Sequence, residues 1–539
     1  GKNIIWNHHL SVPYHSMDEV DDLHFQPEKG GGNLIVEGDN LIALKALLPQ
    51  YSGKVDCIYI DPPYNTGNEG WVYNDKVNSP LIKDWLGKEV NSDDLTKHDK
   101  WLCMMTPRLK LLKELLNDNG VIFISIDDNE QHHLKSIMDD VFGSENFVSI
   151  FPWRKRTAKS DVPFGISQDF EWIMCYAQND FLAGVISQRN YKYSEDFGDN
   201  GWRLTDLTTQ RNEKERPNSA FTLVDPKTKK EYPHNPKRVW AITKDTFKEY
   251  YDKGKIIFPN DYDFLKISIP SYRVFESEDR QKATEKYGTE NILKAVSTML
   301  PKEVGMTQDG NKEMVKLFGS KLFSFPKPVG LIQYLISVLN NKDALILDSF
   351  AGSGTTMHAV MQLNKEDGGN RQCIMVQMPE NSESEPDKNV CRDITRERVK
   401  RAIEKYGFNT GFKYLRVGSP IDPETMLDGD LPTYQQFAEY VYYLATGGHL
   451  ADKSKVDAAQ HFVGMEGGRA VYLIYEQDMD QLTRLALTLQ IAEAIIKHSP
   501  GKRRVIFAPS CFLDEEYMAA MQIEFVSVPY NLFERKADV

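Results

Sequence analysis

Cys57-Ile58-Tyr59-Ile60-Asp61-Pro62-Pro63-Tyr64-Asn65 (CIYIDPPYN) is an apolar run that ends on an acid, two prolines and an aromatic ring. Residues 55–60 are predicted to form a buried strand, because the run is short and rich in β-branched and aromatic residues. Asp61 then lies at the carboxyl end of a strand, the edge where open parallel sheets bind ligands. The prolines stiffen the turn and remove two N–H donors. This turn suits a flat group bearing an NH₂, with Asp61 and the Pro62 carbonyl as acceptors and Tyr64 stacked on the ring.

An ordinary strand that ends in an Asp-Pro turn would have the same pattern, because Asp-Pro is a common turn former. A second stretch, residues 344–356 (ALILDSFAGSGTT), favours the ligand-binding interpretation. It predicts a strand, then a bend in which Gly352 and Gly354 let the backbone approach a ligand, then the start of a helix with free N–H groups. It lacks the G-x-x-x-x-G-K-[ST] pattern, and Met357 stands where G-x-G-x-x-G needs its third glycine. A nucleoside with a carboxylate and no phosphate fits this loop better than a nucleotide.

The segments around both stretches alternate between strands and helices. Strands are predicted at 33–37, 121–126 and 374–377, and helices at 41–48, 101–117, 129–142, 331–339 and 391–406. Asp39 lies at a strand-to-helix junction, where it can cap the helix, contact a ligand, or do both. Glu380 follows the strand at 374–377, where an acid can accept hydrogen bonds from ribose hydroxyls. The order predicts an α/β fold with a parallel sheet.

The length of 539 residues predicts several domains. We expect an amino-terminal arm (1–32), a first core segment (33–150), an insert (151–320), a second core segment (321–418) and a small carboxyl-terminal α/β domain (419–539). In the last of these, helices are expected at 434–446 and 480–498 and strands at 469–476 and 503–509. Residues 65–100 are polar and are expected to form a mobile loop.

Basic residues concentrate in the middle of the chain. Residues 151–330 hold 30 Lys and Arg against 25 Asp and Glu, a net charge of +5, whereas the rest holds 35 against 53, a net charge of −18; the sum is the −13 of the whole chain. A charged, loop-rich insert with aromatic residues can follow a phosphate backbone and reach base edges, although a solvated surface insertion would look similar. The DNA-binding candidates are Arg154, Lys155, Arg156, Lys159, Arg203 and Arg211.

Composition argues against several other classes of protein. No apolar run reaches the roughly 18–20 residues that span a bilayer, and the first residues show no signal pattern, so a cytoplasmic location without a membrane is expected. The six cysteines are scattered without a C-x-x-C pair, which argues against structural zinc and disulfides. The pairs His8-His9 and His132-His133 are expected to be solvated, and no metal is expected.

Together, the two stretches resemble motifs of the amino-methylating DNA methyltransferases, and specifically of the modification (Mod) subunits of Type III restriction-modification systems. Asp61-Pro62-Pro63-Tyr64 looks like the catalytic DPPY of that family, and residues 348–354 (DSFAGSG) look like its F-x-G-x-G cofactor loop. Supporting matches are residues 38–40 (GDN), Lys327-Pro328 and residues 394–398 (ITRER). The resemblance covers residues 30–415.

The resemblance implies a Rossmann-like methyltransferase sheet in circularly permuted order, with S-adenosylmethionine as cofactor, no metal, and a target-recognition domain in the insert. It implies catalytic roles for Asp61, Pro62, Pro63 and Tyr64. It further implies that the cofactor is held by Asp39, Lys327, Pro328, Asp348, Phe350, Gly352, Ser353, Gly354, Thr355 and Glu380, with Phe350 and the glycines at the methionine portion, Glu380 at the ribose and Asp39 near the adenine.

The activity implied is methylation of N6 of a flipped adenine in duplex DNA. The alternatives are an N4-cytosine DNA methyltransferase, an RNA or protein amino-methyltransferase, and an inactive module that still binds cofactor and DNA. The resemblance also implies a homodimer and a separate helicase-nuclease restriction subunit as a partner. Because this chain shows no phosphate loop, we expect it to methylate DNA without cutting it.

Overall fold

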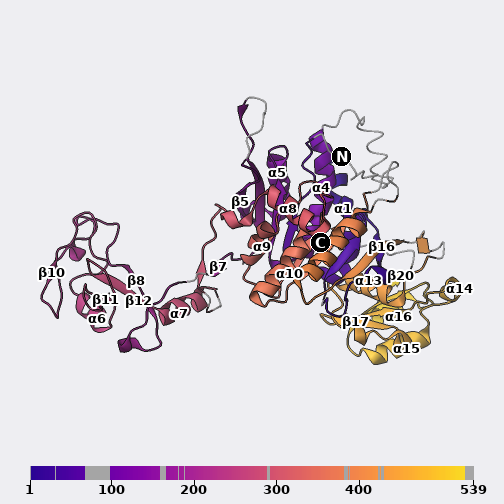
Figure 1. Ribbon diagram of the computed structural model, residues 1–539. Helices are drawn as coiled ribbons and strands as arrows, with labels where there is room; N and C mark the ends of the chain where they lie inside the picture. The colour runs from indigo at the N-terminus through magenta and orange to yellow at the C-terminus, as the bar shows by residue number, and fades with distance from the viewer. Residues whose placement is uncertain are drawn as a thin grey trace. The chain divides into compact units, whose positions relative to one another are not determined.

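The computed structural model describes the whole chain except residues 1, 31, 67–96, 158–164, 180, 187–188, 288–289, 291, 381–386, 388, 423–424, 427–429 and 529–539. The chain divides into two compact units (Figure 1). Unit 1 comprises Gly1–Phe181 and Ser297–Val539, and unit 2 comprises Leu182–Val296. Both of the stretches that dominate the sequence therefore belong to unit 1.

A nine-stranded sheet forms the centre of unit 1. Its strand order is β1-β16-β2-β15-β14-β3-β4-β6-β5. The strands are β1 (Tyr14–Glu19), β16 (Lys413–Ile421), β2 (Leu34–Glu37), β15 (Gln372–Gln377), β14 (Leu345–Asp348), β3 (Val55–Ile60), β4 (Leu116–Ile126), β6 (Phe170–Ala177) and β5 (Phe147–Arg154). The six strands from β16 to β4 run parallel, and β1, β6 and β5 add antiparallel pairs at the two sides.

Strands from distant parts of the chain are neighbours in this sheet. β14 lies between β15 and β3, with Leu347 opposite Ile58. In Figure 1, indigo strands from the early part of the chain lie among orange segments from its later part. The predicted α/β fold and permuted strand order are confirmed. Because neighbouring parallel strands end at the same edge, the residues after Ile60 and those after Leu347 meet there.

Helices pack on the sheet in two groups. One group comprises α1 (Lys2–Ser11), α2 (Asn40–Tyr51), α4 (Lys97–Leu115) and α5 (Gln131–Phe142), which contact one another through α4. The other comprises α8 (Thr307–Phe318), α9 (Val329–Ser337), α10 (Thr355–Asp367) and α11 (Glu397–Tyr406), linked through α10 and α11. Leu44 and Leu48 of α2 and Leu109 and Leu112 of α4 are fully buried in the same apolar core as residues of β3 and β4.

The expectation of an amino-terminal arm at residues 1–32 is wrong. Helix α1 packs on α4, and β1 pairs antiparallel with β16 at the edge of the sheet. Lys45 donates a hydrogen bond from Nζ to the carbonyl of His9 at 2.9 Å, and the ring centroids of Tyr14 and Tyr440 lie 4.5 Å apart. The segment is too polar to show a local pattern, and its structure comes from contacts with α4, Lys45, β16 and Tyr440, which lie outside it in the sequence.

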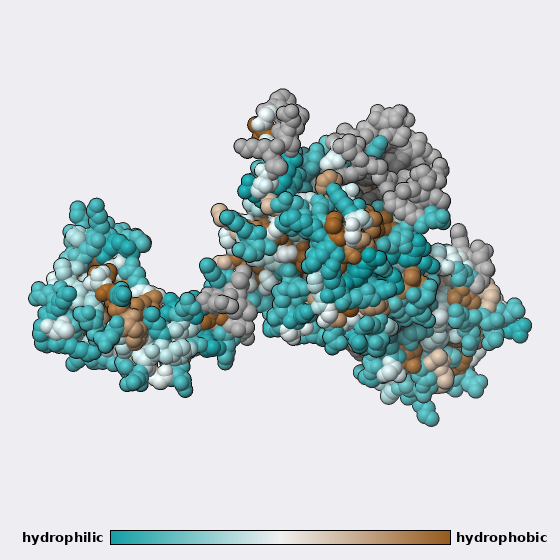
Figure 2. All heavy atoms as spheres, viewed as in Figure 1, coloured by the Kyte–Doolittle hydropathy of each residue, from teal (hydrophilic) through white to brown (hydrophobic). Residues whose placement is uncertain are grey.

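Unit 2 is smaller than the expected insert at 151–320, because β5 and β6 belong to the central sheet and residues from Ser297 onward return to unit 1. It contains a three-stranded sheet of β11 (Ile256–Ile257), β12 (Ser271–Phe275) and β8 (Trp202–Asp206), the short pairs β9 (Leu223–Val224) with β10 (Glu231–Tyr232) and β7 (Val185–Ile186) with β13 (Leu293–Lys294), and the helices α6 (Phe247–Asp252) and α7 (Glu276–Tyr287). Its own apolar cores include Trp240, Phe258 and Trp202. In Figure 2, mostly hydrophilic residues cover the visible face of unit 2.

The carboxyl-terminal part of unit 1 forms a second sheet of β17 (Phe462–Glu466), β18 (Arg469–Leu473), β19 (Arg503–Ala508) and β20 (Ile523–Ser527), with a last short helix, α16 (Glu515–Ala520). The predicted helix at 434–446 is confirmed as α13 (Tyr434–Thr446), which contacts both this sheet and α2. The single long helix expected at 480–498 is wrong. It is split into α14 (Met479–Leu482) and α15 (Leu489–His498), because the backbone of Leu487 bonds to Ser510 and Phe512 instead of continuing a helix.

No helix among the described residues is both long and apolar enough to cross a membrane.

Candidate functional site

The turn after β3 places Asp61 and Tyr64 side by side. The Tyr64 hydroxyl lies 2.7 Å from Asp61 Oδ1, to which it can donate a hydrogen bond. The indole N–H of buried Trp101 donates to the Pro63 carbonyl at 2.7 Å, which fixes the proline-rich backbone. Burial, and the carboxylate of Asp61, hold the pKa of Tyr64 well above its usual range, so this phenol stays protonated. The turn therefore presents a carboxylate and an aromatic ring at the sheet edge, as predicted.

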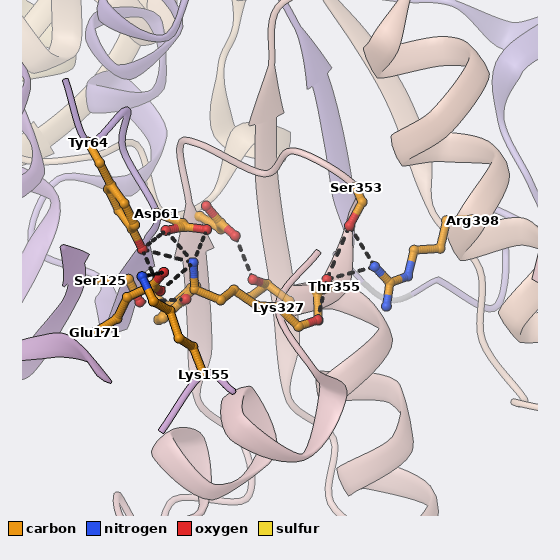
Figure 3. Close-up of polar contacts among 12 residues, drawn as sticks. Asp61, Tyr64, Ser125, Lys155, Glu171, Lys327, Ser353, Thr355 and Arg398 are labelled. Carbon is orange, nitrogen blue, oxygen red and sulfur yellow. Dashed lines mark hydrogen bonds and ion pairs between the residues drawn. The ribbon is translucent and has the colours of Figure 1, made fainter. Parts of the chain in front are cut away.

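Lys327 reaches this turn from the second half of the chain (Figure 3). Its Nζ lies 2.8 and 2.7 Å from the two carboxylate oxygens of Asp61 and 2.9 Å from the Tyr64 hydroxyl. The main-chain carbonyl of Lys327 accepts a hydrogen bond from the Thr355 hydroxyl at 3.3 Å. One residue thus joins the turn after β3 to the start of α10, so the two decisive stretches form one site.

Glu171, on β6, completes the polar cluster around Asp61. Its Oε2 lies 3.1 Å from the Tyr64 hydroxyl and 3.4 Å from Lys327 Nζ, and its Oε1 lies 3.4 Å from Lys155 Nζ. Asp61 and Glu171 face Lys327 and Lys155, so two negative and two positive charges balance. The sequence interpretation missed Glu171, because it assigned residues 151–320 to an irregular insert and did not recognise β6.

The residue after Tyr64 is anchored separately. Asn65 adopts a positive φ of 59° and donates from Nδ2 to Glu130 Oε1 at 2.5 Å. Glu130 is fully buried and also accepts from His98 and His133 at 2.7 and 2.9 Å. His133 was expected to be solvated, and this is wrong; the sequence signal was the spacing of three residues from Glu130 on the same helical turn. The nitrogens and oxygens of this trio lie within 4.8 Å of one another, but their direct hydrogen bonds already use the carboxylate.

The bend after β14 depends on two glycines in the left-handed conformation. Gly352 and Gly354 have φ angles of 52° and 81°, which favour glycine. A Cβ at Gly354 would lie 2.9 Å from the Thr395 carbonyl oxygen, and one at Gly352 would lie 3.1 Å from the Phe323 ring. The Gly352 N–H donates to Gln377 Oε1 at 2.7 Å. Side chains at these positions would collide with neighbouring protein atoms, so glycine is required by the packing of the bend and by its left-handed backbone; the approach of a ligand to this bend stays a prediction.

Asp348, at the end of β14, bonds to residues on both sides of the glycine bend. It is buried and accepts hydrogen bonds from the Thr356 hydroxyl at 2.5 Å and the Phe350 N–H at 3.0 Å. Burial raises its pKa to about 7. Both carboxylate oxygens of Asp348 are used within the protein, which indicates a role in shaping the loop.

A π-helical turn at Cys391–Arg396, continuous with α11, covers the other side of the bend. The Thr395 hydroxyl donates to the Gly352 carbonyl at 2.6 Å. Buried Arg398 donates from Nη1 to the hydroxyls of Ser353 and Thr355 at 2.7 and 2.6 Å (Figure 3), and burial lowers the pKa of this guanidinium to about 10. The segment 394–398 was noticed in the sequence, but its direct contacts with the loop were not predicted.

The junction between β2 and α2 also touches the bend. Asp39 caps α2 by accepting from the N–H groups of Leu41 and Ile42, so the predicted cap is confirmed. Asn40 donates to the Ser349 carbonyl at 3.0 Å and accepts from buried Arg108 at 2.5 Å. Glu380, with a φ of 57°, lies beyond β15 and accepts from Gln377 at 2.7 Å. These acids therefore stand at the carboxyl ends of β2 and β15, the two strands that precede β14 in the strand order of the sheet.

Comparison with known proteins agrees with this geometry. A family model described as DNA methylase (N6_N4_Mtase) matches residues 55–404, which is more than half of the chain and spans both stretches. The chain belongs to the DNA methylase family. Its enzyme class, a DNA methyltransferase, is the one that the sequence predicted.

Two relatives of this methylase are modification subunits, so the resemblance seen in the sequence is confirmed. This chain is 32% identical over 464 residues to the Type III restriction-modification enzyme StyLTI Mod subunit of Salmonella typhimurium, and the match covers 80% of this chain and 67% of the relative. It is also 32% identical over 406 residues to the EcoPI Mod subunit of Escherichia phage P1, covering 69% of this chain and 61% of the relative. The methylase thus spans about two thirds of their length. A solved structure, the PvuII DNA methyltransferase (cytosine-N4-specific), aligns over 70% of this chain and 94% of its own with a TM-score of 0.34 and 10% identity.

The DNA-binding candidates of the methylase differ in their surroundings. Arg154 is exposed at the end of β5, and Arg211 is exposed in unit 2, paired with Glu215 at 3.0 Å. Lys155 pairs with Glu171, and Arg156 donates to the Gln168 carbonyl at 3.1 Å. Arg203 makes a two-point bond to Asp279, with distances of 2.7 and 3.0 Å. Lys159 lies outside the described residues, as does most of the loop expected at 65–100, of which Lys97 onward is helix α4.

Proposed function

We propose that this methylase transfers the methyl group of S-adenosylmethionine to N6 of an adenine flipped out of duplex DNA, as the modification subunit of a Type III restriction-modification system. The observation that carries the proposal is the bridge through Lys327, which brings the DPPY turn to the glycine bend. An aminoacyl nucleoside without phosphate suits the bend, because the two glycines adopt left-handed conformations that let the backbone approach a ligand and the first turn of α10 offers N–H groups to a carboxylate.

The cofactor supplies an electrophilic methyl group on sulfur, and the protein prepares the acceptor. A flipped adenine costs a few kcal/mol in lost stacking and pairing. Tyr64 restores about 1–3 kcal/mol by stacking on the base. The N6 amino group donates its hydrogens to Asp61 and the Pro62 carbonyl, which favours a pyramidal nitrogen with its lone pair directed at the methyl group. Positioning and fixed acceptors lower the barrier.

The remaining assignments follow from this reading. Phe350, Gly352, Ser353, Gly354 and Thr355 line the cofactor, with Asp348 beneath them, Lys327-Pro328 at one side, and Asp39 and Glu380 at the nucleoside. Unit 2 is the target-recognition domain. In that unit Arg211 is the more exposed candidate, although it pairs with Glu215, whereas the less exposed guanidinium of Arg203 bonds to Asp279. We also propose a homodimer and a separate restriction subunit as partner, in the cytoplasm where the DNA lies.

Replacing Asp61 by Ala tests the catalytic assignment. We expect the transfer of tritiated methyl groups to duplex DNA to fall at least a thousandfold, while the affinity for S-adenosylmethionine, measured by calorimetry, changes less than threefold. Tyr64→Ala should lower the transfer less than Asp61→Ala, because neighbouring groups replace part of the stacking. Turnover by Asp61→Ala equal to that of the wild type would contradict the assignment.

Digestion of the methylated DNA to nucleosides separates the alternatives. N6-methyladenine is expected; N4-methylcytosine, or transfer to RNA in place of DNA, would favour the related amino-methyltransferases. An absence of transfer together with intact cofactor and DNA binding would identify an inactive module. Asp in place of Ser at position 61 favours adenine in this family.

A further inference from the structure

Lys327 occupies the acceptors that a target amine needs. Its ammonium contacts both oxygens of Asp61, at 2.8 and 2.7 Å, and the Tyr64 hydroxyl at 2.9 Å. The side chain is only 9% exposed. An ammonium and an amino group are both N–H donors, so they compete for the same carboxylate. Lys327 therefore provides an internal substitute for the amino group of the base.

Deprotonation of Lys327 cannot release its side chain from Asp61. The nearby carboxylates of Asp61 and Glu171 outweigh the effect of burial and raise the pKa of Lys327, so it remains an ammonium at neutral pH. A buried ammonium that leaves one carboxylate needs another, because an unpaired buried charge is costly. The side chain must have a second negative partner within reach.

Glu171 is that partner. Its carboxylate already lies 3.4 Å from Lys327 Nζ and 3.1 Å from the Tyr64 hydroxyl, and it is 12% exposed. The long aliphatic stem of Lys327 allows its ammonium to move a short way while its backbone stays bonded to Thr355. Glu171 comes from β6, whereas Asp61 follows β3, and both carboxylates lie beside the ammonium of Lys327 (Figure 3).

We propose that Lys327 occupies the amine position at Asp61 in the absence of DNA and shifts onto Glu171 when the target base enters, which makes Glu171 a positioning residue for base entry. A neutral base then replaces a charged group at Asp61 without a change in the net charge of the site. This inference rests on the proposed function, because it requires an amino group as the substrate.

The test is a double-mutant cycle between Glu171 and Lys327, measured as methyl transfer to a duplex that carries the recognition site, located by sequencing modified bases in a host that expresses the methylase. In Glu171→Gln the ammonium has lost its second partner and stays on Asp61. We expect kcat/KM for DNA to fall at least tenfold, mainly through a higher KM, while the affinity for S-adenosylmethionine stays within threefold of wild type.

In a Lys327→Met background there is no ammonium that could shift onto Glu171. Adding Glu171→Gln to Lys327→Met should therefore change kcat/KM less than threefold, because the two residues act through one contact. Asp169→Asn, an acid two positions before Glu171 that accepts from the Ser167 hydroxyl, serves as the matched control and should stay within twofold of wild type. Melting temperatures of all variants show whether each of them folds.

Equal losses from Glu171→Gln in the two backgrounds would overturn the inference while leaving the proposed function intact. A wild-type protein that methylates no DNA, RNA or nucleoside would overturn both.

Discussion

Asp348 shows how burial alone changes the chemistry of one residue. It follows an apolar strand and lies under the glycine bend, where water does not reach it. Burial favours the neutral acid and raises its pKa from 3.8 to about 7, although the Thr356 hydroxyl and the Phe350 N–H oppose the change. Asp61 follows the neighbouring strand β3 at the same edge of the sheet. Unlike Asp348, it forms an ion pair with Lys327.

The raised pKa of Asp348 predicts a pH dependence of stability. Between about pH 4 and pH 7 the folded protein keeps a proton that the unfolded chain has released, so the free energy of unfolding falls as the pH rises through this range. Asp348→Asn removes this titration. The stability of the wild type relative to Asp348→Asn should fall by at most about 4 kcal/mol from pH 4 to pH 8, as measured by urea unfolding without cofactor. A constant difference across this range would show that Asp348 is ionised throughout.

Gly354 provides a prediction about space and backbone conformation together. Gly354→Val should weaken the binding of S-adenosylmethionine more than tenfold in calorimetry, because the added side chain meets the Thr395 carbonyl and a left-handed conformation costs about 1–2 kcal/mol. Gly368→Val at the other end of α10 is the matched control: its φ is 68°, but a Cβ there meets nothing within 4 Å. Gly368→Val should lower stability and keep cofactor affinity. Equal affinities in both variants would place the cofactor elsewhere.

At the scale of elements, the glycine bend is held by segments that come before and after it in the chain. Asn40 at the start of α2, Gln377 at the end of β15 and Thr395 in the π-helical turn all bond to its backbone. A loop that makes a close approach to a ligand has few bonds of its own, so its neighbours supply them. The shape of the glycine bend therefore depends on three packed elements, and its sequence alone does not determine it.

Thr395→Val tests this support, because valine keeps the shape and removes the hydroxyl that bonds to the Gly352 carbonyl. A lost hydrogen bond of about 1 kcal/mol should weaken the binding of S-adenosylmethionine roughly fivefold. The control is Thr446→Val at the end of α13, where the hydroxyl bonds to the Tyr442 carbonyl four residues earlier. That variant should bind cofactor as the wild type does. Unchanged affinity in Thr395→Val would show that the π-helical turn does not support the loop.

At the scale of the whole molecule, the two units differ in how they are stabilised. Unit 1 draws residues from both ends of the chain into one sheet and one large core, which extends through α13 to the carboxyl-terminal sheet. Unit 2 has short strands, small apolar cores and nearly balanced charge, with 21 Lys and Arg against 18 Asp and Glu in residues 182–296, a net charge of +3. Such a unit is organised independently of the catalytic sheet.

Replacing residues 182–296 by a short Gly-Ser linker should therefore leave unit 1 folded. We expect the shortened protein to bind S-adenosylmethionine within threefold of the full chain and to lose site-specific methylation of duplex DNA. The isolated unit 2 should show cooperative unfolding by circular dichroism. Full sequence specificity in the shortened protein would contradict the assignment of unit 2 to target recognition.

Local patterns predicted the elements whose stability comes from their own sequence. The strand at 55–60 and the helix at 434–446 have the predicted bounds, because the first is a short apolar run ended by prolines and the second carries a Thr433 cap with Gln436. Prediction failed where the partner is distant. Residues 1–32 were predicted to be an arm because local sequence does not reveal the pairing of β1 with β16. β6 lies in a segment that was assigned to the basic insert, so Glu171 was not predicted as a site residue.

The sequence by itself determined the chemistry available to this methylase: an acid and a ring on a stiff turn, a glycine bend before a helix, and the family to which both belong. Only the tertiary structure decided which groups meet. Lys327 and Asp61 are 266 residues apart, and they touch because β14 inserts beside β3 in the sheet. A residue's conformational preferences act within a few positions of the chain, whereas strand order and side-chain partners depend on how the whole core packs.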